Sequence, residues 1–253
     1  MAVLKKIENN IAILQLNRLK VNAINEEMVD ELIKHLLDLK SENSIKGVIL
    51  TGHSGFFSAG LDVIELFPQS KKEITNFWIK FNELLIEIFS YPKLIFSAIT
   101  GHSPAGGTVI AIMTDYRIMA KGNYKIGLNE VAVGLILPGA IGKVFQYVLG
   151  TRNAEIFGLT GKLVAPEHAL EVGLVDEIFP LEDVLAETKS KIQAWLKLPN
   201  YQQGLTKRKL RDSIIKEIKQ NQAIYIEEII DIWFSNPGQK ILGGLVEKLK
   251  KQT

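Results

Sequence analysis

The sequence places one carboxylate, Glu130, in a long apolar stretch, IGLNEVAVGLILPGAIG, with no other charge before Lys143. Burying an ionised glutamate among aliphatic side chains costs free energy unless an opposite charge or hydrogen bonds compensate for it, so its presence here calls for an explanation. Two interpretations are open: a carboxylate at a strand end that reaches solvent, or an acid/base group directed into a pocket. Apolar surroundings would raise the pKa of Glu130 and suit it for moving a proton at carbon.

Two further segments each follow an apolar, strand-like run and carry glycine: HSGFFSAGLDV (53–63) and GHSPAGGTVIA (101–111). Small side chains let the backbone approach a ligand, and the second segment should open a helix whose first N–H groups lack intrahelical partners. One N–H from each segment, directed at one carbonyl oxygen, would form an oxyanion hole. Either segment alone is weak evidence, because glycine after a strand usually marks only a turn.

These segments need a scaffold, and the pattern of apolar residues predicts one. Met28, Leu32, Leu36 and Leu39 recur at helical spacing, and such helices alternate with short β-like runs. We expect strands at 11–16, 47–52, 93–101, 116–120 and 124–128, and helices at 26–40, 74–91 and 108–113. This alternation is typical of an α/β fold with a largely parallel sheet, in which ligands bind beyond the carboxyl ends of the strands.

After about residue 143 the sequence becomes mostly helical, and the last part is amphipathic and charged. We therefore predict an α/β core at 1–195 and a helical C-terminal oligomerisation region at 196–253. Residues 94–114 carry no formal charge, but HSPAGG interrupts them, so we expect a buried strand and helix and not a membrane span.

The composition excludes several kinds of chemistry. Thirty basic and twenty-eight acidic residues give a net charge of +2, which offers no argument for a nucleic-acid partner. The absence of cysteine excludes disulfides and thiolate nucleophiles, and the four histidines lack metal-binding spacing, so we expect no metal. The N-terminal residues lack the pattern of a signal peptide, and we expect a soluble, cytoplasmic protein.

The segments FFSAGLDV, YPKLIFSAITGHSPAGGTVIAIMTDYRIMA and IGLNEVAVGLILPGAIG resemble the crotonase superfamily, also called the enoyl-CoA hydratase/isomerase family. NRLKVNAINEEMVDEL and ALEVGLVDEIFP are similar to the same family, so the resemblance covers about residues 11–180. It implies a spiral of ββα units and a helical C-terminal region that forms a homotrimer or hexamer. It also implies an acyl-CoA thioester substrate and no separate cofactor, because coenzyme A is part of the substrate.

The resemblance also implies the roles of particular residues. The backbone N–H groups of Ala59 and Gly106 would hold the thioester oxygen, and Glu130 would be the catalytic carboxylate. The predicted substrate-binding residues are Asn22, Ala23, Ser58, Gly60, Leu61, Asp62, Gly107 and Asn129. The basic run KRKLR (207–211) either meets the CoA phosphates or, as we prefer, forms a solvated helix face.

One position separates two reactions within the resemblance. Hydratases of this family use two glutamates, and Val109 stands at the first position while Glu130 stands at the second. Valine cannot activate water, whereas one carboxylate and an oxyanion hole suffice to move a double bond from the 3,4 to the 2,3 position. In this respect the sequence is similar to the mitochondrial type of enoyl-CoA delta isomerase, which implies a role in fatty-acid beta-oxidation.

Other enzymes of the family, a hydratase or a thioester hydrolase, remain alternatives, as does a non-catalytic acyl-CoA-binding protein. We expect Asn129 to orient Glu130, and His53 and His102 to be loop-packing residues. Asp115 and Arg117 should form a structural pair near a strand start. The acyl chain should lie against Phe67, Trp78, Phe81 and residues 131–137.

Overall fold

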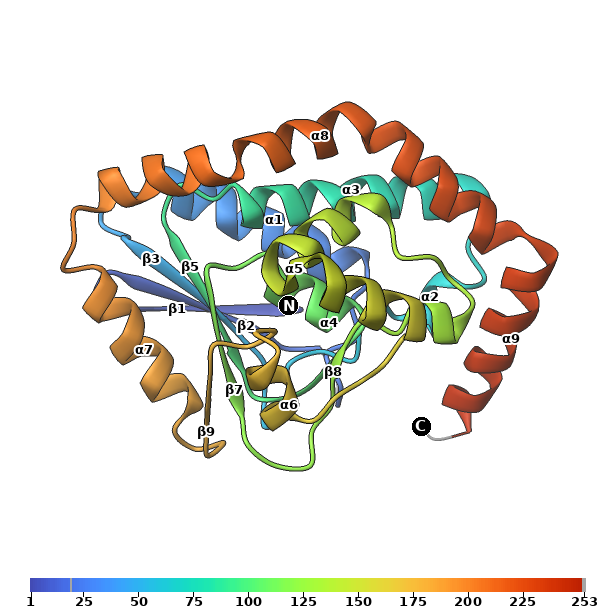
Figure 1. The fold of residues 1–253 in the computed structure, drawn as a ribbon, viewed down its shortest axis with the longest axis horizontal. Helices are drawn as coiled ribbons and strands as arrows, with labels where there is room; N and C mark the ends of the chain where they lie inside the picture. The colour runs from blue at the N-terminus through green and yellow to red at the C-terminus, as the bar shows by residue number, and fades with distance from the viewer. Residues whose placement is uncertain (19, 252–253) are drawn as a thin grey trace.

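A six-stranded sheet runs through the centre of the molecule (Figure 1). This computed structural model describes residues 1–18 and 20–251. The strands, in their order across the sheet, are β1 (Val3–Glu8), β2 (Ile11–Leu16), β3 (Gly47–Thr51), β5 (Leu94–Ile99), β7 (Tyr116–Ala120) and β9 (Glu177–Phe179). β1 and β2 are antiparallel and all other neighbours are parallel, so the prediction of a largely parallel sheet is confirmed.

The first strand, β1, was not predicted from the sequence. Its central residues are charged and exposed, so it lacks the apolar run by which the other strands were recognised. Asn9 and Asn10 join it to β2 with φ angles of 46° and 62°. Asparagine tolerates this left-handed region, and two such residues in succession form the tight turn that two antiparallel strands require.

A second, three-stranded sheet contains β4 (Gly55–Phe56), β6 (Gly101–Pro104) and β8 (Ile126–Gly127). β4 follows β3, β6 follows β5, and β8 follows β7, so the chain repeats a strand–strand–helix unit, and the predicted spiral of ββα units is confirmed. The three short strands are parallel in the order β4-β6-β8. The segments that leave their carboxyl ends therefore start side by side.

Helices cover both faces of the large sheet. α1 (Glu26–Ser41) and α3 (Lys71–Phe89) lie over one face, and α7 (Val184–Trp195) packs against the other (Figure 1). Both faces of strand β2 are apolar and therefore need a helical cover. Leu14 and Leu16 belong to the core on the α1 side, whereas Ile11 and Ile13 pack in the cluster that contains Ile192 of α7. This alternation follows from the two-residue period of a strand.

The predicted core face of α1 is confirmed, because Met28, Leu32, Leu36 and Leu39 are fully buried. α3 begins three residues earlier than the apolar pattern indicated. Ser70 and Glu73 form a capping box there, in which each side chain accepts a hydrogen bond from the other residue's N–H. Such a cap starts a helix before its first buried residue.

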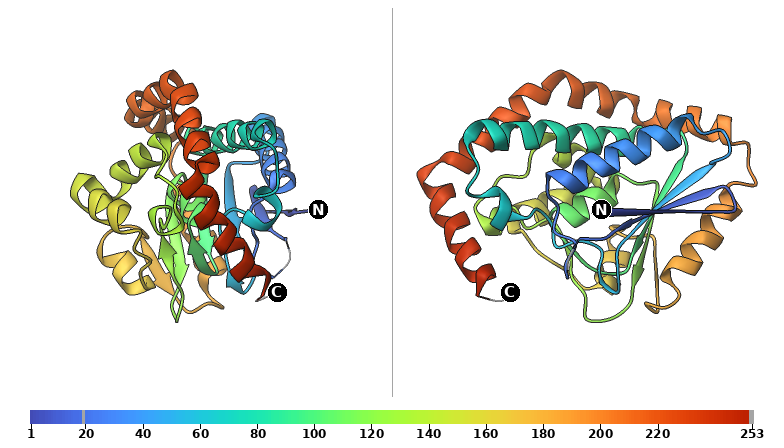
Figure 2. Two further views of the ribbon diagram at one scale, coloured as in Figure 1. Left: turned by 90° about the vertical axis from the view of Figure 1, so that its right-hand side faces the viewer. Right: turned by 180° about the vertical axis from the view of Figure 1, so that it is seen from behind.

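The remaining helices are α2 (Val63–Leu66), α4 (Gly106–Ile112), α5 (Gly139–Thr160), α6 (Pro166–Glu171), α8 (Asn200–Phe234) and α9 (Asn236–Lys250), with a short 3₁₀ turn at Val131–Val133. α8 runs along α3, and α9 then turns back across one side of the molecule (Figures 1 and 2). Ile229 and Trp233 of α8 are buried in the core that also contains α3. The predicted region 196–253 is thus packed onto the α/β core, and its last two residues lie outside the described part.

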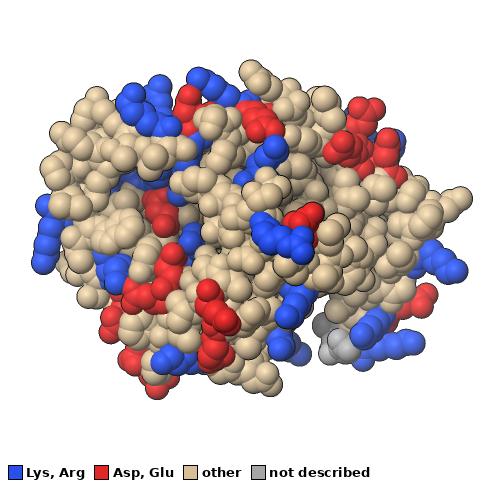
Figure 3. All heavy atoms as spheres, viewed as in Figure 1, with Lys and Arg blue, Asp and Glu red and all other residues tan. Residues whose placement is uncertain are grey.

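Basic and acidic side chains are interspersed over the face seen in Figure 3, with wide uncharged areas between them. This distribution agrees with a net charge of +2. Among the helices that the structure describes, none combines the length and apolar character that a membrane crossing requires.

Candidate active site

Three segments meet at the carboxyl ends of the short strands. Residues 58–61 follow β4, Ala105 and Gly106 follow β6, and Asn129 and Glu130 follow β8. The N–H of Ala105 donates to the carbonyl of Gly127 over 2.9 Å, which continues the β6–β8 pairing to the start of α4. The sequence prediction that the chemistry-bearing segments lie beyond strand ends is therefore confirmed.

Two backbone N–H groups in these segments are unpaired and close together. Within the described part of the chain, neither the N–H of Leu61 nor that of Gly106 has a hydrogen-bond partner. A β-carbon added at Gly106 would lie 3.3 Å from the nitrogen of Leu61 and 3.2 Å from the Cα of Gly60. The two loops thus approach so closely that only glycine fits at position 106 without a shift, and the two N–H groups can serve one acceptor.

Ala59, predicted as one of the two donors, is wrong in that role. Its N–H donates to the carbonyl of Val21 over 2.9 Å, and the next N–H, of Gly60, donates to Ser58 Oγ over 3.1 Å. Of three successive N–H groups, only that of Leu61 is left for a ligand. The sequence could not show this, because the choice depends on Val21, which lies far away along the chain.

Ala105 holds a strained conformation directly before the Gly106 N–H. Its φ of 47° and ψ of −121° lie outside the regions that residues with a side chain favour. Such a conformation costs about 1–3 kcal/mol and persists only where the surrounding structure imposes it. Here the bond to Gly127 fixes Ala105 on one side, and helix α4 fixes it on the other.

Thr108 joins the parts that hold this loop. Its side chain is fully buried, and its Oγ1 donates to the carbonyl of Ser103 in β6 and accepts from the N–H of Gly127 over 2.8 Å. One hydroxyl therefore ties α4 to both neighbouring short strands. Gly107 was predicted to bind substrate. It lies close against the loop that follows β4, because a β-carbon at position 107 would be only 2.6 Å from the carbonyl oxygen of Ser58.

Asn22 and Ser58 have internal partners for their side chains. Asn22 is fully buried with a φ of 50°, and its amide donates to the Phe57 carbonyl over 3.1 Å and accepts from the Arg18 N–H over 2.9 Å. Ser58 Oγ donates to the Asn22 carbonyl over 2.7 Å. Both side chains shape the segment before Leu61, and their predicted contact with coenzyme A stays a prediction.

Asp62 and Ala23 are held by Arg18, a residue that the sequence analysis did not single out. The Arg18 guanidinium contacts Asp62 Oδ2 at 2.5 Å and the Ala23 carbonyl at 3.0 Å. Asp62 also accepts from the N–H of Glu65 at the start of α2. This ion pair joins the segment around residue 22 to the loop that bears Leu61. In the sequence, the only indication of it is that Arg18 stands shortly before the segment NAIN (22–25).

Glu130 lies three residues after β8, directly before the 3₁₀ turn. Its side chain is 8% exposed, and its Oε2 is buried with no hydrogen-bond partner among the described residues. Burial raises the pKa of Glu130 from 4.5 to about 7, and a hydrogen bond from its own backbone N–H offsets part of the rise. The solvent-exposed interpretation of this carboxylate is therefore wrong, and the structure gives it the pKa of a base that works near neutral pH.

Glu130 lines a cavity of about 180 Å³ together with Ala59, Leu61 and Gly106. The rest of the wall is almost wholly apolar. Its lining residues also include Trp78, Phe81, Val109, Asn129, Val133, Leu135, Ile136, Pro138, Ile141, Ile229, Leu245 and Leu249. The one carboxylate and the two unpaired N–H groups thus share a single apolar cavity, which is the arrangement that acid/base chemistry beside a carbonyl requires.

The predicted acyl wall agrees only partly with this cavity. Trp78, Phe81 and members of the 131–137 segment line it, whereas Phe67 does not and packs beside Gly243 of α9. The wall also includes Ile229 of α8 and Leu245 and Leu249 of α9. The sequence showed that these helices are amphipathic, but not which part of the core their apolar faces cover.

Asn129 and Val109, which the sequence analysis singled out, both lie in the cavity that contains Glu130. Asn129 lines the cavity, and its Oδ1 is buried without a hydrogen-bond partner in the described part of the chain. Val109 is 1% exposed and lines the same cavity, at the position where family hydratases carry a second glutamate. In the described part of the chain, the lining of the cavity therefore contains one ionisable side chain, that of Glu130.

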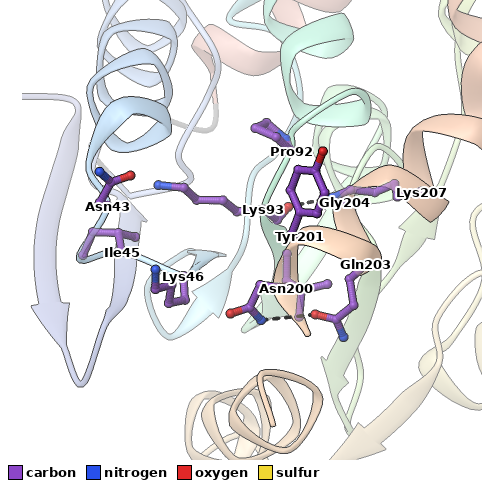
Figure 4. Close-up of a pocket in the computed structure, with 11 residues that line it drawn as sticks. Asn43, Ile45, Lys46, Pro92, Lys93, Asn200, Tyr201, Gln203, Gly204 and Lys207 are labelled. Atoms are coloured by element: carbon purple, nitrogen blue, oxygen red, sulfur yellow. Dashed lines mark hydrogen bonds between the residues drawn. The ribbon is translucent and has the colours of Figure 1, made fainter. Parts of the chain in front are cut away.

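The basic run at 207–211 divides between two environments, so neither earlier interpretation describes it fully. Arg211 is buried and Lys207 is half-buried, and they contact Asp115 at 3.0 and 2.7 Å, while Arg208 and Lys209 are exposed. Lys207 Nζ also donates to the carbonyl of Lys93, at the start of β5. A pocket beside this contact lies at the amino ends of β3 and β5 (Figure 4), opposite to the end that carries Glu130.

The predicted pair of Asp115 with Arg117 is wrong, because each residue has another partner. Asp115 pairs with the two cations of α8, and Arg117 pairs with Asp176 at 2.9 Å. His102 accepts a hydrogen bond from the N–H of Lys125, and its ring packs tilted against Phe56 and edge-on against Tyr124, which is a packing role. The described residues contain no cluster of His, Cys, Asp or Glu that could hold a metal ion.

The family model for enoyl-CoA hydratase/isomerase matches residues 6–248. The chain therefore belongs to the enoyl-CoA hydratase/isomerase family, and the resemblance stated from the sequence is confirmed.

Individual relatives are more specific. The chain is 33% identical to mitochondrial enoyl-CoA delta isomerase 1 of Mus musculus, over 96% of this chain and 84% of that protein. The corresponding protein of Homo sapiens is 32% identical over 96% and 81%. The crystal structure of the human mitochondrial delta3-delta2-enoyl-CoA isomerase matches with a TM-score of 0.97 and 32% identity, covering 100% of both chains.

Hydratases also share the fold. The crystal structure of an enoyl-CoA hydratase from Bacillus halodurans matches with a TM-score of 0.88 and 25% identity, over 96% of this chain and 100% of that chain. Because both kinds of enzyme have this fold, the reaction must be argued from the residues of the site.

Proposed function

We propose that this protein is an isomerase that converts 3-enoyl-CoA thioesters to trans-2-enoyl-CoA. The observation that carries the proposal is the single buried carboxyl of Glu130, which shares an apolar cavity with the unpaired N–H groups of Leu61 and Gly106. The relatives described above are named as enoyl-CoA delta isomerases, and this supports the same reaction.

In the proposed reaction the thioester oxygen accepts hydrogen bonds from the N–H groups of Leu61 and Gly106. Glu130 removes a proton from C2, and the electron pair moves into the C1–C2 bond while negative charge develops on the oxygen. Glu130 then gives the proton to C4, whose new bond to hydrogen takes the electron pair of the C3–C4 double bond. The C1–C2 pair moves to C2–C3, and the charge on the oxygen re-forms the thioester carbonyl. No atom is gained or lost, so one base is sufficient.

A pKa of about 7 suits this task. A carboxylate with an ordinary pKa is too weak a base to remove a proton from carbon. A raised pKa reduces the gap between the pKa of the carboxyl group and that of the C2–H group, at a pH where the carboxyl is still partly ionised. The apolar wall also keeps water away from the charged intermediate.

Val109 argues for isomerisation and against hydration. Adding water to a double bond calls for a second positioned group, and valine at this place in the cavity neither binds nor activates water. Thioester hydrolysis needs a water held against the thioester carbon, and most side chains that line this cavity are apolar.

The wider context is part of the proposal. We infer a role in fatty-acid beta-oxidation, an acyl-CoA substrate without a separate cofactor, and a homotrimer or hexamer assembled through the predicted C-terminal region, 196–253. The cytoplasmic location expected from the sequence stays a prediction, and the relatives named above are mitochondrial proteins. Light scattering on the purified chain tests the assembly, since a monomer would contradict it.

The function is tested by assaying the purified protein on 3-enoyl-CoA and 2-enoyl-CoA substrates in parallel. We expect the 3-enoyl thioester to be converted to the 2-enoyl isomer, and the 2-enoyl thioester not to be hydrated at a comparable rate. Efficient hydration of crotonyl-CoA would show that the argument from Val109 is wrong. Binding of both thioesters without turnover would instead favour a non-catalytic acyl-CoA-binding protein.

A further inference from the structure

Helix α3 carries two buried N–H donors without partners among the described residues, and one of them, on Trp78, lines the acyl cavity. Trp78 and Asn82 stand one helical turn apart and thus on the same face of α3. They are 6% and 8% exposed, and neither Trp78 Nε1 nor Asn82 Nδ2 has a hydrogen-bond partner among the described residues. A buried donor left unpaired costs about 1–3 kcal/mol, so an acceptor at this place would be favoured.

Both side chains line a second, very small cavity. Its volume is about 10 Å³, which is close to the space that one oxygen atom with its hydrogens occupies. It adjoins the larger cavity that holds Glu130, and the two share several lining residues. The shared residues are Trp78, Phe81, Pro138, Ile141 and Ile229.

Among the residues that the structure describes, no charged side chain lines the small cavity. Its other walls are Asn82, Leu85, Ala140, Tyr225 and Ile226. An anion placed here would lose its hydration without meeting an opposite charge, which is much more costly than burying a neutral oxygen. The chemistry of this place therefore fits a hydroxyl or carbonyl oxygen.

We propose that the small cavity beside Trp78 and Asn82 is a subsite for a neutral oxygen carried by the acyl chain, away from the thioester. The preferred substrates are then 3-enoyl-CoA thioesters whose chain bears a hydroxyl or keto group at the carbon that reaches α3. This inference rests on the proposed function, because it names a substrate class for the same site. It goes beyond that function, because the isomerisation itself needs no oxygen at this position.

The size of the preference follows from the hydrogen bonds gained. One or two hydrogen bonds to donors that are otherwise unpaired correspond to roughly a 5- to 30-fold preference for the oxygenated chain over the plain hydrocarbon. The effect should be confined to one chain length, since a 10 Å³ cavity at a fixed place accepts the oxygen of only one carbon position.

The test uses the full chain and a series of 3-enoyl-CoA thioesters of increasing length. Each length is supplied plain, with a terminal hydroxyl, and with a terminal carboxylate, and kcat/KM is measured for each. At one length we expect the hydroxylated substrate to exceed the plain one by roughly 5- to 30-fold, and the carboxylate to fall below both. A plain chain that is preferred at every length would overturn the inference, because water would then be the occupant of the cavity.

Two variants separate the donor from the shape of the cavity. Asn82→Leu removes a donor at similar volume and should bring the ratio of hydroxylated to plain kcat/KM towards one. Ile226→Val trims the same wall without removing a donor and should keep the ratio. The same ratio in both variants would contradict the proposal, and Trp78→Phe repeats the test if Asn82→Leu does not fold.

A binding measurement keeps this test independent of turnover. Calorimetry with saturated acyl-CoA analogues, plain and hydroxylated, should show the same preference in the dissociation constants. If no 3-enoyl thioester is isomerised but the hydroxylated analogue binds more tightly, the proposed reaction fails and the subsite stands. If isomerisation occurs and neither assay shows a preference, only the subsite fails.

Discussion

Replacing Glu130 by glutamine should make the protein more stable at alkaline pH, although it should also remove activity. The pKa of Glu130 is about 7 in the folded chain and 4.5 without burial, so the folded state disfavours the ionised form. The stability contributed by the neutral form is complete below about pH 4.5 and is lost as the pH rises through about 7. The two pKa values correspond to a loss of about 3 kcal/mol once the carboxyl is ionised.

The free energy of unfolding from urea titrations measures this effect. Glu130→Gln stays neutral at all pH values, so at pH 8 it should exceed the wild type by up to about 3 kcal/mol, and at pH 5 by less than about 1 kcal/mol. Glu182→Gln is the matched control, because it changes an exposed glutamate outside the cavity and should leave the stability unchanged.

The reasoning is refuted if Glu130→Gln shows the same difference from the wild type at both pH values. It is also refuted if the variant is the less stable protein at pH 8. Either result would mean that burial does not disfavour the ionised form of Glu130 in the folded chain, contrary to the raised pKa.

Four further results are expected. Below about pH 7, kcat/KM should fall towards tenfold for each pH unit, because a protonated Glu130 cannot accept a proton; a flat pH–rate profile would argue against it as the base. Gly106→Ala should lower kcat by up to about a hundredfold to a thousandfold and should also lower the free energy of unfolding in urea, since its β-carbon would lie 3.2 Å from Gly60 Cα and 3.3 Å from the nitrogen of Leu61 and would push the two loops apart; unchanged kcat would contradict an oxyanion hole formed by these N–H groups. Thr108→Val should lower the free energy of unfolding by about 1–3 kcal/mol, as measured in urea, because the Gly127 N–H loses its buried acceptor. Asp115→Asn should lower the thermal midpoint and cost about 3–5 kcal/mol, since it leaves the two cations of α8 without their carboxylate; stability within error of the wild type would contradict the ion cluster.

Much of the fold was predictable because apolar periodicity follows directly from burial. The helix face of Met28 to Leu39 and the strands β2, β3, β5 and β7 all have long apolar runs or clear spacing. β1 was missed because its exposed centre reads LKKI, and its existence depends on a two-residue turn and a neighbouring strand. Elements that are stabilised by a partner and not by their own burial leave little trace in the sequence.

The site was predictable in outline and not in atomic detail. Glu130 stood out because a charge in an apolar run is unusual, and its burial follows from that same composition. The pair of N–H donors was assigned to the right loops, but Ala59 was chosen instead of Leu61. Only the positions of Val21 and Ser58, which occupy the two preceding N–H groups, decide which donor is left for a ligand.

The assignment of Asp115 failed for a related reason. Asp115 and Arg117 are close in sequence, but Asp115 lies in the bend before β7 and Arg117 lies in β7, and each pairs with a residue elsewhere in the chain. Asp115 meets cations that lie about ninety residues later, on α8. Long-range ion pairs of this kind require knowledge of how α8 crosses the ends of the strands.

Turnover of a 3-enoyl-CoA thioester by Glu130→Gln, measured together with its binding of the same thioester, tests the account most directly. We predict that kcat falls by about a hundredfold to ten-thousandfold while the dissociation constant changes little. A glutamine variant that isomerises at the rate of the unaltered protein would contradict the account, because the proton would then be moved by some other group.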